Sequence, residues 1–290
     1  MKDLLTFIRE SLINEGGNSV ESASPISGDK ALPVAKEIIS VISKKFNCKC
    51  APLGSTGKKR KDQESGDIDI ALELDWDKHS EVVDFVKTKL GNAKEFGNIN
   101  NTLQVFNFGY EWEPGKIVQI DFMFVDDVDF AEFAYHSPDF TKNESKYKGM
   151  YASALLMAVT KIVPVDGEED TEFEHWQYFF DQNKGLKVIK LSYEGKNGKR
   201  LKNPKKVEEK QITKNISKTV KLILGDKAEK EDCNSFESLV SYLSSDNFKY
   251  KDKYEDIKKN FLNDWQIKMK TSPELLKELE DFMNEKFNLK

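Results

Sequence analysis

The sequence predicts an α+β protein, in which a module with a mixed sheet is followed by a mostly helical module. Two observations carry this prediction: short strand-like segments alternate with helical ones in the first half, and helical periodicity dominates the second half. The 290 residues, 38% of them hydrophobic, are enough for two modules with cores of their own. We therefore expect an N-terminal helix and loop at residues 1–29, the sheet module at residues 30–140 and the helical module at residues 141–290.

The first elements are read from periodicity and turn residues. Residues 1–12 favour a short amphipathic helix, and residues 14–29 form a Gly-, Ser- and Asn-rich stretch that is typical of a loop. Apolar residues then recur at helical spacing over residues 30–46. Residues 48–53 resemble a short strand that ends at a Gly-Ser pair.

The rest of the first half alternates in the same way. Residues 67–74 alternate charged and apolar side chains as a strand does, and residues 80–90 have helical periodicity. Two further strands, residues 102–108 and 116–125, flank a turn-like Glu-Pro-Gly at residues 113–115. With a possible short helix after the Gly-Ser pair, the predicted order from residue 30 is helix, strand, helix, strand, helix, strand, strand.

After an acidic connector the pattern becomes mainly helical, with one possible strand at residues 186–193. The predicted helices cover residues 146–162, 171–180, 207–224, 236–243, 254–265 and 273–287. The segment 195–214 carries eight Lys or Arg against two Glu, so it is either a solvated loop and helix edge or a track for phosphates. The aromatic run at residues 176–180 favours a helical core more than a base-stacking surface.

Charge and composition exclude several classes of protein. The net charge of −5 argues against a generic nucleic-acid binder, although residues 1–140 carry −8 and residues 141–290 carry +3. The longest apolar run, near residues 152–159, is far short of a membrane span, and no secretion signal precedes it, so we expect a soluble cytoplasmic protein without membrane contact. The three cysteines and three histidines lack the spacing of a zinc site, which indicates buried thiols.

Three aspartates carry the strongest chemical signal. Asp67 and Asp69 alternate with Ile68 and Ile70 in a strand, so the two carboxylates project to the same side. Asp121 stands between apolar residues of a later strand, where a charged group needs a partner. Carboxylate oxygens on rigid strands suit Mg²⁺, and the cation would relieve the repulsion between the acids. Solvent-facing strand acids are the alternative reading.

A Gly-Ser pair and a polar, basic segment precede the aspartates. Glycine at position 54 lets a phosphate approach the backbone, and Ser55 can donate a hydrogen bond to it, where the strand turns into a possible short helix. Lys58, in the basic run 58–61, would add positive charge, although such a run is equally typical of a solvated loop. A Gly-Ser pair alone and an Asp-x-Asp pair alone are both common. The two motifs in this order indicate a nucleoside triphosphate bound with Mg²⁺.

These motifs resemble the nucleotidyltransferases of the DNA polymerase beta-like superfamily. The resemblance covers residues 30–125, and its motifs match in order and kind: Gly54-Ser55, Asp67-Ile68-Asp69-Ile70 and Ile120-Asp121-Phe122. The local sequence around the aspartates is especially similar to that of family X DNA polymerases. The interval between the Gly-Ser and the Asp pair is slightly longer, and the N-terminal segment is too short for a helix-hairpin-helix module, so we do not expect a repair polymerase. The opening residues 12–18 also resemble bacteriophage nucleotidyltransferase-like proteins, which would place the protein in a host cytoplasm.

The resemblance implies an enzyme that transfers a nucleotide from an NTP such as ATP to an acceptor hydroxyl and releases pyrophosphate. It implies that Asp67, Asp69 and Asp121 hold two Mg²⁺ ions, with Mn²⁺ as a substitute, and that Asp121 accepts the proton of the nucleophile. Gly54, Ser55, Lys58 and, by position after the first module, Lys148 would bind the triphosphate. We expect the acceptor to be an RNA 3′ end, with a protein hydroxyl, a small molecule, or a non-catalytic nucleotide-binding or partner-binding relative as alternatives.

Overall fold

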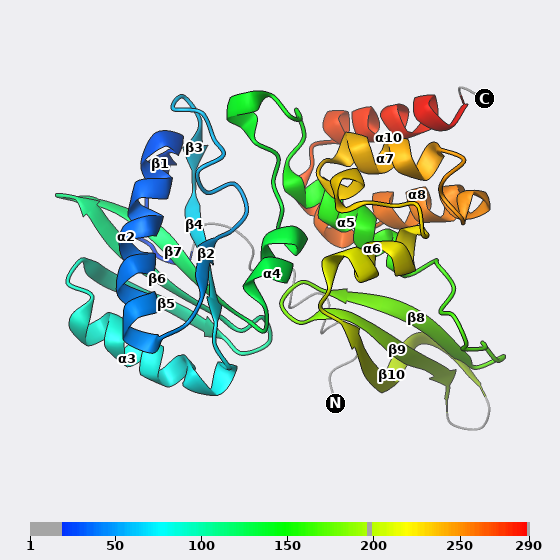
Figure 1. Cartoon of the computed structure of the whole chain (residues 1–290), viewed down its shortest axis with the longest axis horizontal. Coiled ribbons are helices and arrows are strands. Elements are labelled where there is room, and N and C mark those ends of the chain that lie inside the picture. The colour runs from blue at the N-terminus through cyan, green and yellow to red at the C-terminus, as the bar shows by residue number, and fades with distance from the viewer. Residues whose placement is uncertain (1–18, 196–198, 289–290) are drawn as a thin grey trace. The chain divides into compact units, whose positions relative to one another are not determined.

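The computed structural model describes residues 19–195 and 199–288, and these divide into two compact units. The N-terminal unit comprises residues 19–146 and 182–184, and the C-terminal unit comprises the other described residues from 147 onward. Element labels follow Figure 1. The mixed α+β class that the sequence predicts is confirmed. The division of roles between the predicted modules stays a prediction.

The N-terminal unit is built on a mixed five-stranded sheet with the order β2-β4-β7-β6-β5. Its strands are β2 (Cys50–Pro52), β4 (Asp67–Glu73), β5 (Ala93–Asn100), β6 (Val105–Glu113) and β7 (Lys116–Val125). β4 and β7 are parallel neighbours, and the other pairs are antiparallel. The sequence predicted these strands except β5, whose Gly- and Asn-containing sequence gives a weak strand signal.

Helices α2 (Gly28–Phe46) and α3 (His79–Lys89) pack against one face of this sheet (Figure 1). α2 forms because buried apolar residues recur every three or four positions: Ala31, Val34, Ile38 and Ile42. The helix ends at Asn47, which takes a left-handed conformation with φ of 49° and donates its N–H to the Ser43 carbonyl. The unit also contains β1 (Ile26–Ser27), β3 (Glu64–Ser65), α4 (Val128–Ala134) and the 3₁₀ turns η1 (Trp76–Lys78) and η2 (Phe140–Lys142).

The two faces of the sheet differ in what they contact. Ile68, Ile70 and Ile120 point into the core beneath α2 and α3 and are fully buried. On the opposite face, Ala71 and Met123 belong to a second, smaller apolar cluster with residues of α4. The alternation of side chains along β4 and β7 therefore places the aspartates on the face away from α2 and α3.

The C-terminal unit combines helices with a three-stranded antiparallel sheet of order β10-β9-β8. α5 (Gly149–Thr160) is its central helix and contacts α6, α7, α8 and β8. The other elements are α6 (Ile216–Leu224), α7 (Phe236–Ser244), α8 (Tyr254–Leu262), α9 (Trp265–Lys270), α10 (Pro273–Asn288), η4 (Lys230–Cys233), η5 (Lys251–Lys253), β8 (Glu174–Asp181), β9 (Gly185–Glu194) and β10 (Arg200–Thr213). Within the described ranges, no helix has the length and apolar character that crossing a membrane requires.

The sheet of the C-terminal unit corrects the prediction of a mostly helical module. Residues 171–180 were predicted to be helical, but β8 occupies this segment, because Trp176, Tyr178 and Phe180 are buried at a period of two. Residues 195–214 were predicted to be a loop and helix edge and residues 207–224 a helix, but β10 extends to Thr213 and only α6 is helical. Strand β9 confirms the strand that was predicted at residues 186–193.

Candidate functional site

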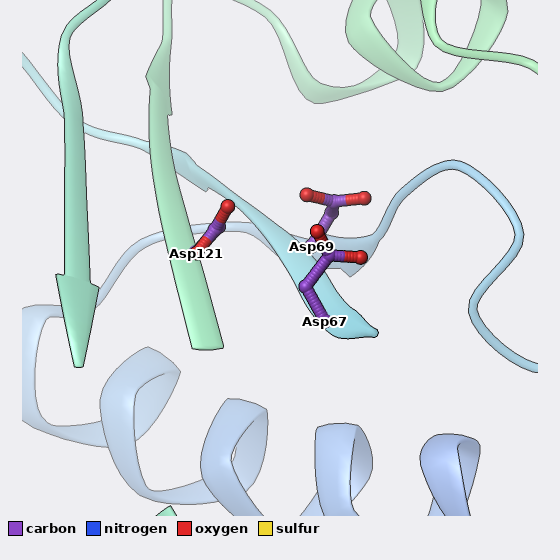
Figure 2. A group of neighbouring side chains, drawn as sticks. All are labelled: Asp67, Asp69 and Asp121. Atoms are coloured by element: carbon purple, nitrogen blue, oxygen red, sulfur yellow. The ribbon is translucent and has the colours of Figure 1, made fainter. Parts of the chain in front are cut away.

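The three predicted aspartates lie together on neighbouring strands. β4 and β7 pair in parallel with Asp69 opposite Asp121 and Asp67 opposite Gln119, so the three acids share one face of the sheet. Figure 2 shows their carboxyl groups on the same side of the two strands. One carboxylate oxygen from each residue lies within 4.8 Å of the others. In the described part of the chain, no other group of three or more His, Cys, Asp or Glu side chains meets this criterion.

Asp121 is the buried member of the cluster and is held by two side-chain amides. Asp121 is only 6% exposed, whereas Asp67 and Asp69 are half-buried. Two amides donate to its Oδ1 atom: Asn107 Nδ2 at 2.6 Å and Gln119 Nε2 at 2.8 Å. The Oε1 atom of Gln119 accepts the N–H of Ser19 at 3.0 Å, which fixes the amide with its nitrogen toward the carboxylate. The sheet thus sets the orientation of Asp121 from two sides.

This donor set fits a hard divalent cation. All three ligands are carboxylates, and Mg²⁺ prefers oxygen ligands, usually one or two carboxylates completed by water and phosphate oxygens. A carboxylate has about four acceptor positions, so the two amide donors on Oδ1 leave Asp121 able to bind a metal. Three acids so close together repel one another unless a cation compensates them, and this is the physical reason to expect one.

Gly54 lies directly beside the aspartates. The N–H of Leu53 donates to the Asp69 carbonyl at 2.9 Å, which holds the end of this segment against β4. Gly54 follows with φ of +59° and forms an isolated parallel bridge with His136. A Cβ added to Gly54 would lie 3.1 Å from Oδ2 of Asp69. The conformation and the close approach to Asp69 both favour glycine at this position. The phosphate-binding role of Gly54 stays a prediction.

Ser55 and Lys58 follow in a tight turn, and the possible short helix after Gly54 is not formed. The Lys58 N–H donates to the Ser55 carbonyl at 3.0 Å, which closes the turn. The half-buried Lys58 ammonium donates to the carbonyl of Ser137 at 2.9 Å, one residue beyond the His136 that bridges Gly54. Burial lowers the pKa of Lys58 below its usual value, opposed by nearby acidic groups. The ammonium is therefore held close to the backbone that carries Gly54.

The remaining basic candidates are placed differently. Lys59 donates to the carbonyl of Glu64, and Arg60 contacts the carbonyl of Phe140, so both anchor the loop that contains them. Lys148 lies in the C-terminal unit, where it is exposed and caps the N-terminus of α5 without a side-chain hydrogen bond to it. The triphosphate-binding role of Lys148, like that of Ser55 and Lys58, stays a prediction.

Sequence reasoning missed the residues that support the aspartates. Gln119 stands two positions before Asp121, so strand alternation would have placed it on the same face. Asn107 is a polar residue between Phe106 and Phe108, which is a detectable signal, but only the pairing of β6 with β7 brings it opposite Asp121. The His136 bridge to Gly54 joins segments far apart in the chain and has no local sequence signal.

Comparisons with known proteins find similarity among solved structures but not among protein families or curated proteins. No protein-family model and no curated protein matches this chain. Among solved structures, it is similar to Leishmania infantum polymerase beta in a ternary P/T complex, with a TM-score of 0.36 and 15% sequence identity. The likeness covers 63% of this chain and 66% of that one, so the chain spans just under two thirds of the polymerase. At this TM-score the likeness does not establish a shared fold.

Proposed function

We propose that this protein is a Mg²⁺-dependent nucleotidyltransferase that moves a nucleotide from an NTP to an acceptor hydroxyl. The observation that carries the proposal is the cluster of Asp67, Asp69 and Asp121, with oxygens within 4.8 Å on two parallel strands and with Gly54 against Asp69. A solvated set of strand acids would not need a buried member held by two amides, as Asp121 is.

In the proposed reaction, the acceptor oxygen forms a bond to the α-phosphorus as the bond from that phosphorus to the pyrophosphate oxygen breaks. Asp121 accepts the proton of the acceptor hydroxyl. Asp67 and Asp69 are the ligands that would hold the metal ions with Asp121, and the ions, when bound, would neutralise the charge that develops on the phosphate oxygens. Gly54 leaves room for the triphosphate beside the strand, and Ser55 donates a hydrogen bond to it.

Lys58 has a specific place in this proposal. A lysine ammonium has three donors, and the Ser137 carbonyl takes one of them, so two remain for phosphate oxygens. The hydrogen bond to the backbone also restricts the side chain before the triphosphate arrives, which reduces the entropy that binding must overcome. We assign Lys58 to the orientation of the β- and γ-phosphates.

We propose an RNA 3′ end as the acceptor, with a protein hydroxyl and a small hydroxylated molecule as the competing candidates. Part of the basic run on β10 is engaged within the protein, because Lys206 pairs with Glu209 and Lys210 pairs with Glu168 and Glu208. Lys199, Lys202 and Lys205 are exposed, and the described residues give them no ion pair; they are the positive charges of β10 and its preceding residue that we assign to an RNA backbone.

The proposal is tested by incubating the protein with each α-labelled NTP and Mg²⁺ in the presence of total RNA or total protein. We expect label in RNA with the wild-type chain and none with Asp121→Ala. Label in protein or in a small-molecule fraction would support the transferase activity and show that the acceptor is not RNA. The absence of Asp121-dependent label from every fraction would contradict the proposed activity.

A further inference from the structure

The C-terminal unit contains a cavity of about 410 Å³ that no step of the proposed reaction uses. Three segments far apart in the sequence form it: the loop at Asp166, α6 (yellow in Figure 1) with the turn that follows it to Asp226, and the pair Lys249 and Tyr250. A volume of several hundred Å³ is that of a small-molecule site. Its walls are charged and aromatic, so its lining indicates the class of ligand.

Helix α6 supplies two lysines to this cavity. Its buried side consists of Thr219, Val220, Ile223 and Leu224. Lys218 and Lys221 are three residues apart, so they lie on the same side of the helix, and both line the cavity. Within the described ranges neither lysine has an ion pair, whereas Lys251 in the same unit pairs with Asp246. Two lysines that share one cavity wall without a carboxylate partner favour an anionic group between them.

A third lysine and an aromatic ring also line the cavity. The Lys249 ammonium lies 5.0 Å from the ring centroid of Tyr250, and both residues line the cavity. A hydrogen bond to Tyr250 and the nearby carboxylates of Asp166 and Asp226 raise the pKa of Lys249, so it stays charged at neutral pH. The two carboxylates can accept hydrogen bonds from hydroxyl or amino groups of a ligand.

We propose that this cavity binds a 5′-nucleotide unit, with its phosphate at Lys218 and Lys221 and its base or ribose against Tyr250. Lysine binds phosphate as a point charge, and an aromatic side chain stacks on any base because every base has a π-face. Asp166 and Asp226 are suited to the ribose hydroxyls or to an exocyclic amine. The unit can be a free nucleotide or one residue of an RNA chain, since both present the same chemistry. The inference does not depend on the proposed transferase activity.

The test is a binding titration of the full chain in EDTA, so that no metal supports a nucleotide at the aspartates. The probes are AMP, a hexaribonucleotide and inorganic phosphate, and their binding is measured by isothermal titration calorimetry. The double variant K218Q/K221Q should weaken the binding of AMP or of the hexamer at least about tenfold through the loss of charge-assisted hydrogen bonds. The matched variant K230Q/K259Q, which removes two exposed lysines outside the cavity, should bind as the wild type does.

The ring has a separate readout. Tyr250→Leu should weaken AMP at least about fivefold by loss of stacking and leave inorganic phosphate unchanged. Tighter binding of AMP than of the hexamer would identify a free nucleotide as the source, and the reverse order would identify RNA. Wild-type affinity in K218Q/K221Q, equal affinity for AMP and inorganic phosphate, or no saturable binding of either nucleotide probe would overturn the proposal.

Discussion

Replacing Asp69 with Asn should stabilise the protein without metal and remove most of its response to Mg²⁺. The oxygens of the three aspartates lie within 4.8 Å of one another. At that separation two unit charges repel by about 0.9 kcal/mol in water and by about 3.5 kcal/mol at the effective dielectric constant of a protein surface. Asp69 has two such neighbours and is half-buried, so we expect the neutral side chain to raise the free energy of unfolding by at least about 1 kcal/mol.

The assay is thermal unfolding in EDTA and in millimolar Mg²⁺. At about 2–4 °C per kcal/mol, Asp69→Asn should melt at least about 2 °C above the wild type in EDTA. Mg²⁺ should raise the melting temperature of the wild type by mass action and that of the variant much less. Asp84→Asn is the matched control, because Asp84 is an exposed acid on α3 outside the cluster. An Asp69→Asn variant that is less stable in EDTA and still responds fully to Mg²⁺ would refute this reasoning.

Three further predictions follow from the same site. Gly54→Ala places a Cβ against the Asp69 carboxylate at a positive φ, so it should lower the free energy of unfolding by about 1 kcal/mol or more and reduce transfer. The control Gly66→Ala, whose Cβ meets nothing within 4 Å, should leave thermal unfolding and transfer nearly unchanged. Asn107→Ala should lower stability by about 1–3 kcal/mol in chemical denaturation and reduce kcat, because it removes a buried donor to Asp121; unchanged values would show that this hydrogen bond is not needed. Because burial lowers the pKa of Lys58, its ammonium should lose its proton at a lower pH than that of an ordinary lysine, and KM for the NTP should rise in the alkaline range. A KM that is equally independent of pH in the wild type and in Lys58→Arg would exclude a phosphate-binding role for Lys58.

The aspartate cluster could be predicted because its signal is local. Alternation along a strand fixes the side to which Asp67 and Asp69 point, and an isolated acid such as Asp121 among apolar neighbours is visible without any structure. The helix α2 was equally clear, since its apolar residues recur at one period over five turns. What the sequence does not contain is the register of β4 against β7, which places Asp69 opposite Asp121.

Two of the three strands in the C-terminal unit, β8 and β10, were missed for different reasons. No residue of β10 is buried and half of its residues are charged, so it has no apolar alternation by which a strand is recognised. Its pairing depends on partners elsewhere in the chain. Glu209 forms an ion pair with Lys187 of β9, with 2.8 Å between Oε1 and Nζ, and the buried Lys187 also pairs with Asp181. In β8, the aromatic residues at alternate positions were overlooked because a run of aromatics also fits a helical core.

The most direct test of nucleotidyl transfer compares an NTP labelled at the α-phosphate with the same NTP labelled at the γ-phosphate. We expect the α-label to become attached to the acceptor and the γ-label to be released in pyrophosphate, with both events requiring Mg²⁺ and Asp121. Transfer of the γ-label to the acceptor, or release of labelled pyrophosphate that persists in Asp121→Ala, would contradict the proposed nucleotidyl transfer.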